Sequence, residues 1–75
     1  MINKIKKILK FIRKPDIAID ENTALGDIGY DSLDQLEAVI ELEDKFDVNL
    51  PDDIFSNVKT VKDLTNEIEN IRNSN

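Results

Sequence analysis

The stretch that decides the fold is Leu25-Gly26-Asp27-Ile28-Gly29-Tyr30-Asp31-Ser32-Leu33-Asp34. A loop ends at Gly29, and a helix is predicted from about Ser32 to Phe46, because neither glycine nor proline interrupts that segment. Asp31 with Asp34, or Ser32 with Gln35, fits a capping box, in which two side chains bond each other's backbone N–H groups. A serine at the first position of a capped helix presents an accessible hydroxyl that is held by the helix and not by the loop.

The predicted second helix carries two apolar arcs. One arc, between about 140° and 240° from Leu33 on a helical wheel, is the predicted core face and consists of Ala38, Val39, Leu42 and Phe46. The other arc contains Leu33, Leu36 and Ile40, and acidic residues border it on both sides. Because a carboxylate is rarely buried without a partner, this second arc is predicted to be an exposed docking stripe. The alternative is an ordinary solvated face.

The rest of the chain predicts three more helical segments. The first is an amphipathic helix that Pro15 ends, with Ile2, Ile5, Ile8, Leu9 and Ile12 at helical spacing. A long loop follows and is expected to be pinned to the core by Ile17, Ile19, Leu25 and Ile28. After an extended connector comes a short turn at residues 53–56. A last helix then starts at Thr60, with Asp63 in the capping position, and buries Val61, Leu64, Ile68 and Ile71. The predicted fold is all-α: residues 1–75 form a single domain, a small four-helix bundle of three main helices and one short helix.

The composition argues against catalysis. The 75 residues include no cysteine and no histidine, so Ser-His-Asp and Cys-His nucleophile pairs and the usual zinc sites are excluded. We therefore predict no enzyme activity, no catalytic residue and no metal ligand. A calcium loop over residues 20–31 is rejected, because Leu25 stands where that loop needs glycine. The sequence shows neither a secretory signal nor a run of about 20 apolar residues. A cytoplasmic protein without stable membrane insertion is expected.

The charge is divided unevenly along the chain. Residues 1–14 hold six of the ten basic residues and none of the 16 acids, so the other 61 positions carry a local charge of −12. The acidic bulk disfavours nucleic acid and favours partners with basic surfaces. The basic first helix could lie on an anionic membrane, but bundle packing explains its apolar stripe more simply.

The motif resembles a known family signature. Gly29-x-Asp31-Ser32-Leu33-Asp34 is similar to the Gly-x-Asp-Ser-Leu signature of acyl carrier proteins, in which the serine bears phosphopantetheine. The family resemblance continues through Glu41-Leu42-Glu43-Asp44-Lys45-Phe46 and Val48-Asn49-Leu50-Pro51-Asp52, and it includes the order of the helices.

The resemblance implies a free-standing, monomeric carrier. A phosphopantetheinyl transferase would attach 4'-phosphopantetheine to Ser32, which Asp31 and Leu33 flank, and the carrier would hold acyl groups as thioesters in fatty acid, polyketide or lipid biosynthesis. It also implies that acyl-processing enzymes with basic patches contact Asp34, Leu36, Glu37, Ile40, Glu43 and Asp44. The acyl chain would be sheltered by residues such as Ile28, Val39, Ile40, Phe46, Ile54 and Val61.

Two questions stay open at the level of sequence. The same acidic stripe could serve an unmodified helical interaction module, and replacing Ser32 with alanine separates that function from the carrier function. Three residues depart from the fatty-acid type of carrier: Tyr30 stands where a small residue is common, Asp47 where glycine often ends the helix, and Glu41 at an often apolar position. The sequence therefore leaves open a housekeeping fatty-acid carrier or a dedicated one.

Overall fold

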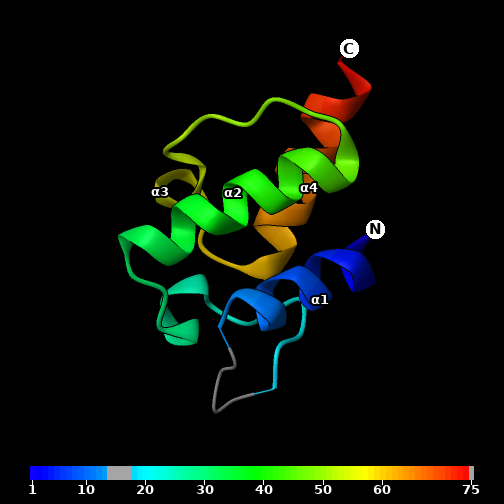
Figure 1. Ribbon diagram of the computed structural model, residues 1–75. Helices are drawn as coiled ribbons and strands as arrows, with labels where there is room; N and C mark the ends of the chain where they lie inside the picture. The colour runs from blue at the N-terminus through cyan, green and yellow to red at the C-terminus, as the bar shows by residue number, and fades with distance from the viewer. Residues whose placement is uncertain (14–17, 75) are drawn as a thin grey trace.

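The computed structural model describes residues 1–13 and 18–74. Its elements are α1 (Ile2–Ile12), a 3₁₀ turn η1 (Leu25–Ile28), α2 (Ser32–Phe46), the short α3 (Ile54–Asn57) and α4 (Val61–Asn73) (Figure 1). The predicted all-α fold of three main helices and one short helix is confirmed. The turn η1 was not predicted. The predicted stop at Pro15 lies outside the described residues; within them, α1 ends at Ile12 and Arg13 is already extended.

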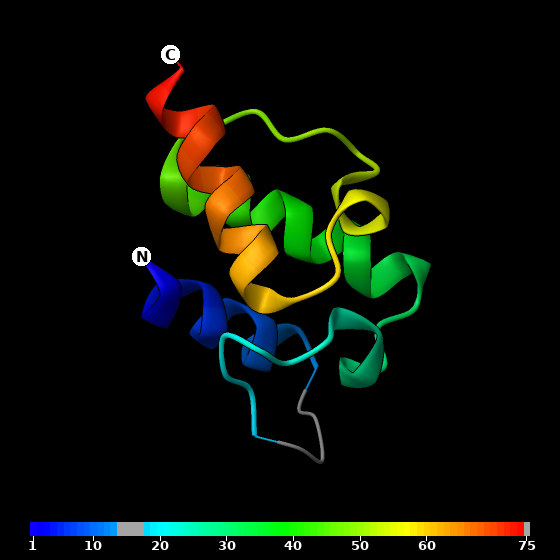
Figure 2. The same cartoon turned by 180° about the vertical axis from the view of Figure 1, so that it is seen from behind.

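The three main helices enclose one hydrophobic core. Helix α1 packs against both α2 and α4, and the views from front and back place α2 and α4 on opposite sides of the molecule (Figures 1 and 2). The predicted core face of α2 is confirmed, because each of its four residues is at most 7 % exposed. In α4, Ile71 is only half-buried, whereas Thr65 is buried and its hydroxyl donates to the carbonyl of Val61 at 2.8 Å. The helical core residues are Ile5, Leu9, Ala38, Val39, Leu42, Phe46, Ile54, Val61, Leu64 and Ile68.

The described part of the long loop is fixed to the start of α4. Ile19, Leu25 and Ile28 are buried as predicted, and Ile17 lies outside the described residues. Three backbone hydrogen bonds hold the loop in place: from Leu25 N–H to Lys59 at 2.8 Å, from Val61 N–H to Thr23 at 3.0 Å, and from Lys62 N–H to Glu21 at 2.8 Å. These bonds satisfy backbone groups that would otherwise be unpaired, and they fix the chain that leads into the start of α2.

Helix α2 ends at a strained residue. Asp47 has φ 54° and ψ 53°, the left-handed conformation in which a side chain is crowded by its own backbone and glycine is preferred. The N–H groups of Asp47 and Val48 both donate to the carbonyl of Glu43, which closes the helix end. Asp47 stands where glycine often ends this helix in the carriers that the sequence resembles, and it adopts the left-handed conformation that glycine favours.

We predict that Asp47→Gly stabilises the fold by about 0.5–1 kcal/mol. The gain comes from relief of the left-handed strain and from removal of a negative charge at a helix C-terminus, and the greater freedom of glycine in the unfolded chain offsets part of it. Chemical denaturation measures the change. Asp44→Gly is the matched control: it lies inside α2, where glycine should cost about 0.5–1 kcal/mol. A lower midpoint for Asp47→Gly would contradict the prediction.

Candidate functional site

Ser32 is the first residue of α2, and its side chain is exposed. The helix is capped by the residue before it: the Asp31 carboxylate accepts from the N–H of Asp34 at 2.8 Å, and the Asp34 carboxylate accepts from the N–H of Asp31 at 3.2 Å. The first of the two predicted capping boxes is therefore the one that forms. Gln35, which the other predicted box paired with Ser32, instead donates its N–H to the backbone carbonyl of Asp31 at 3.0 Å. The cap is complete without the Ser32 hydroxyl.

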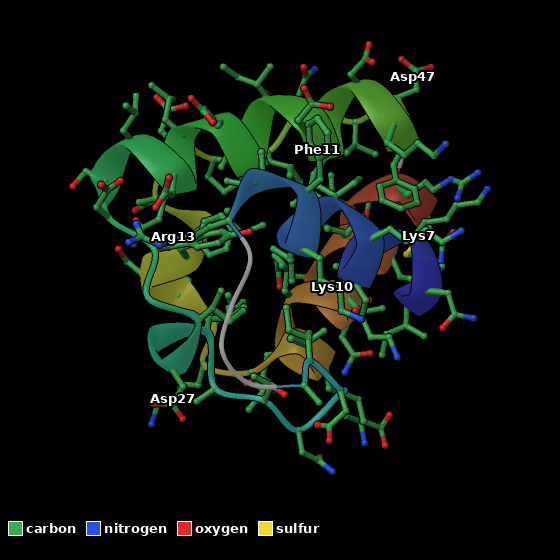
Figure 3. The ribbon with its side chains drawn as sticks, turned by 60° about the horizontal axis from the view of Figure 1, so that its bottom comes forward. Lys7, Lys10, Phe11, Arg13, Asp27 and Asp47 are labelled. Carbon is green, nitrogen blue, oxygen red and sulfur yellow. The ribbon has the colours of Figure 1, made fainter. Side chains whose placement is uncertain are left out.

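Helix α1 is attached to this motif at its C-terminal end. The Arg13 guanidinium donates to the Asp34 carboxylate at 2.9 Å, and Figure 3 shows Arg13 turned toward the start of α2. This hydrogen bond, together with that from the Asp31 N–H, holds the pKa of Asp34 below its usual range. The Tyr30 hydroxyl donates to the carbonyl of Leu9 in the last turn of α1. Two side-chain contacts thus fix the motif against α1.

Tyr30 has a structural role that explains its departure from the family pattern. Its ring is half-buried, and its centroid lies 6.1 Å from that of Phe55 in a tilted arrangement that aromatic pairs favour. Gly29, just before it, has φ +86°, a left-handed conformation that costs glycine little. The turn at Gly29 thus carries the chain from η1 to Tyr30, which bridges α1 and α3.

A groove of about 410 Å³ lies beside the start of α2. Gln35 contributes to it and lies about one helical turn after Ser32, which is not itself among the lining residues. The loop and α3 supply the rest of its wall. It is lined by Ala24, Leu25, Gly26, Tyr30, Gln35, Phe55, Val58 and Lys59.

The residues predicted to shelter an acyl chain do not line this groove. Five of them, namely Ile28, Val39, Phe46, Ile54 and Val61, belong to the closed core, and the sixth, Ile40, is 55 % exposed. Sequence reasoning missed the groove because its wall comes from three separate segments. The sequence feature that could have indicated the groove is the pair of aromatic residues Tyr30 and Phe55, which both line it.

The apolar stripe of α2 is exposed, as the helical wheel predicted. Leu33, Leu36 and Ile40 are 62 %, 50 % and 55 % exposed, and the neighbouring Glu37 and Asp44 are exposed as well. We name Leu33, Leu36 and Ile40 the α2 stripe.

Two of the acids predicted for recognition have structural partners as well. Glu43 is only partly exposed, and its carboxylate accepts from the N–H of Leu50 at 2.9 Å. This bond holds the connector against α2. Asp34 is engaged by Asp31 and Arg13. The freely exposed acids beside the α2 stripe are thus Glu37 and Asp44.

Ser32 offers an exposed hydroxyl to which another group could be attached. The sequence contains neither histidine nor cysteine, and in residues 1–13 and 18–74 no three acidic side chains gather as metal ligands would. An exposed hydroxyl at a helix N-terminus is suited to carry an anionic ester, because unpaired backbone N–H groups and the helix dipole favour negative charge there.

Comparison with known proteins agrees with this geometry. A family model described as a phosphopantetheine attachment site matches residues 2–68. An acyl carrier protein of Sulfurovum sp. is 42 % identical over 57 residues, which cover 76 % of this chain and 76 % of the relative. The chain belongs to the acyl carrier protein family. The members of this family are carriers and not enzymes, so the predicted absence of enzyme activity is confirmed by family membership.

Solved structures of acyl carrier proteins have the same fold. The 3,7-dioxo-octyl actinorhodin acyl carrier protein of Streptomyces coelicolor superimposes with a TM-score of 0.80 at 26 % identity, over 99 % of this chain and 92 % of that one. An acyl carrier protein of Thermotoga maritima gives a TM-score of 0.76 at 27 % identity, over 97 % and 87 %. As for membranes, none of the helices in the described part of the chain has the length and apolar character needed to cross one.

We predict that Tyr30 makes stability fall at alkaline pH. Its burial raises the pKa of the hydroxyl above the ordinary 10.0. The contribution of Tyr30 is therefore complete below pH 10 and is lost as the pH rises further, because only the unfolded chain ionises readily. Tyr30→Phe should cost about 0.5–1.5 kcal/mol at neutral pH, through loss of the bond to Leu9.

Denaturation of the wild type and of Tyr30→Phe at neutral and alkaline pH measures these effects, and the difference between the two proteins isolates the contribution of the Tyr30 hydroxyl. The gap between the wild type and Tyr30→Phe should shrink above pH 10. Parallel stability curves would show that the hydroxyl is not protected by the fold.

Proposed function

We propose that Ser32 bears a 4'-phosphopantetheine arm and that residues 1–75 act as one monomeric carrier domain. The observation that carries this proposal is the exposed hydroxyl at the first position of a helix whose cap is supplied by other side chains. Asp31 and Leu33 flank the attachment point. The family match across residues 2–68, which include Ser32, supports the assignment. The arm, when attached, supplies a thiol that holds acyl groups as thioesters.

The modification would proceed by phosphoryl transfer from coenzyme A. The Ser32 oxygen forms a bond to the β-phosphorus of coenzyme A, the bond from that phosphorus to the bridging oxygen breaks, and adenosine 3',5'-bisphosphate leaves. A base on a phosphopantetheinyl transferase takes the serine proton. The groove beside Ser32, about 410 Å³ in volume, is within the range of small-ligand sites and is the proposed resting place of the arm. The cargo would be an acyl group of fatty acid, polyketide or related lipid biosynthesis.

The α2 stripe is the proposed docking surface for the transferase and for acyl-processing enzymes with basic patches. Leu36 and Ile40 offer apolar contacts, and the exposed acids Glu37 and Asp44 would steer a basic partner toward them. Asp34 and Glu43 remain proposed recognition residues, and they also hold the motif and the connector in place. The cytoplasmic location stays a prediction.

Incubation with coenzyme A and a broad-specificity phosphopantetheinyl transferase should raise the intact mass by one phosphopantetheine. Fragmentation should place the group on Ser32. Ser32→Ala should abolish the mass change, and Ser56→Ala, which alters another exposed serine, should leave it intact. An unchanged mass with an active transferase would refute the carrier function of Ser32. Partner binding that survives in Ser32→Ala, without any modification of the wild type, would indicate the unmodified interaction module.

Reversal of charge beside the α2 stripe should weaken partner binding. Glu37→Lys should reduce affinity for the transferase by about 2- to 10-fold at low salt, and the loss should shrink as salt is added. Glu69→Lys is the matched control, because Glu69 is an exposed acid on α4. Binding assays across ionic strength measure the effect. If Glu37→Lys and Glu69→Lys behave alike, the acids of α2 are only a solvated surface.

Glu43→Lys should behave differently from Glu37→Lys. Loss of the Glu43 carboxylate leaves the N–H of Leu50 without its partner, so the fold should lose about 1 kcal/mol in addition to any loss of binding. Glu43→Gln keeps an acceptor without the charge, and it should recover most of that stability. Denaturation of the two variants separates the structural role of Glu43 from its role in recognition.

A further inference from the structure

The outward side of α1 carries charge and an aromatic ring that the fold does not use. The buried residues of α1 are Ile5 and Leu9, and the partly buried Ile2 and Ile8 also pack against the core. With Ile5 as zero, Lys10 and Lys7 fall at about 140° and 200° on the helical wheel, opposite the core, and Phe11 and Lys4 fall at about 240° and 260°, beside Ile8 at the edge of the core face. All four side chains are exposed. We name them the basic α1 face; Figure 3 views the molecule with α1 toward the reader.

Phe11 is the feature that bundle packing leaves unexplained. It is 82 % exposed, more than any residue of the α2 stripe. It is not an isolated apolar spot, because it lines a groove of about 450 Å³ between α1 and α2 together with the half-buried Ile8. Lys4 and Lys7 line the same groove. An exposed aromatic ring flanked by cations is typical of a helix that lies in a membrane interface.

The lysines of the basic α1 face are free to meet an external anion. Among the described residues, the ion pair within salt-bridge distance joins Arg13 to Asp34, and no lysine takes part in one. No acid occurs in the first 14 residues. At physiological ionic strength charges are screened beyond about 8 Å. A surface in contact with α1 therefore meets mainly the nearest charges, and the net charge of −6 acts only weakly. The nearest charges are the lysines of the basic α1 face and, across the groove, Glu41, Asp44 and Lys45.

We propose that the basic α1 face adsorbs reversibly on an anionic lipid bilayer, with the lysines at the lipid phosphates and the Phe11 ring at the boundary with the acyl chains. A bilayer fits better than nucleic acid, because Phe11 needs an apolar phase behind the layer of negative charge. A bilayer also fits better than an acidic protein, because Lys4, Lys7 and Lys10 are spread along the length of α1. Glu41 and Asp44, across the groove from Phe11, limit the approach and keep the contact peripheral.

This adsorption is separate from the attachment of the arm. Ser32 and the α2 stripe belong to α2, and none of them is part of the basic α1 face. A carrier held by α1 would therefore leave Ser32 and the α2 stripe outside the contact, whereas Asp44, which lines the groove with Phe11, would lie near the bilayer. The two proposals can fail independently, because binding to lipid requires no modification of Ser32.

Sedimentation with lipid vesicles tests the proposal on the whole chain. The protein should bind vesicles of phosphatidylglycerol and phosphatidylcholine in equal parts and should not bind vesicles of phosphatidylcholine alone. The double variant Lys7→Gln with Lys10→Gln should bind about 25-fold more weakly, at about fivefold for each lysine. Phe11→Ala should lose about tenfold. The charge-matched control, Lys59→Gln with Lys62→Gln, and the variant Ser32→Ala should each bind like the wild type.

A tryptophan probe gives a second measurement. The chain contains no tryptophan, so Phe11→Trp creates a single one whose fluorescence should shift to shorter wavelength when the ring enters the bilayer. Circular dichroism confirms that the variants fold, as expected for exposed positions. The proposal is overturned if anionic vesicles do not bind the protein, or if both lysine pairs matter equally. It is also overturned if RNA or polyglutamate binds as tightly as the vesicles do and Phe11→Ala has no effect.

Discussion

The reciprocal bonds between Asp31 and Asp34 set the point at which α2 begins, and the rest of the site depends on that point. Because the cap is formed by these two residues, Ser32 becomes the first residue of the helix and keeps its hydroxyl free. The same Asp34 carboxylate accepts from Arg13 and so attaches the end of α1. The Asp34 side chain therefore couples the start of α2 to the end of α1. These contacts explain why Asp34 is only partly exposed.

The sequence predicted those features that depend on local spacing. The two arcs of α2 could be separated because acids border the arc of Leu33, Leu36 and Ile40 on both sides, and Glu43 lies between the two arcs. The cap of α4 was predictable for the same reason, since Thr60 and Asp63 are three positions apart and bond each other as a capping box requires. The buried loop residues Ile19, Leu25 and Ile28 were recognisable because isolated apolar residues in a polar loop have few other uses.

The features that the sequence could not predict are contacts between distant segments. Tyr30 reaches a carbonyl 21 positions away, and no periodicity in the sequence indicates that pairing. The bond from Leu50 to Glu43 depends on how the connector folds back along α2. Phe11 was overlooked because it lies outside the apolar stripe that predicted α1. The roles of Tyr30, Glu43 and Phe11 depend on contacts or surfaces that form only when the chain is folded.

Helix α2 sets a fixed distance between Ser32 and the α2 stripe. Both belong to one continuous helix, in which each residue advances the axis by about 1.5 Å. Ile40 is eight positions after Ser32, so the two lie about 12 Å apart along the axis. An enzyme that docked on the proposed surface at Ile40 would hold the attachment point of a group on Ser32 at that distance. Docking would then determine where the cargo is delivered, and a tethered group would need to search only the volume within its own reach.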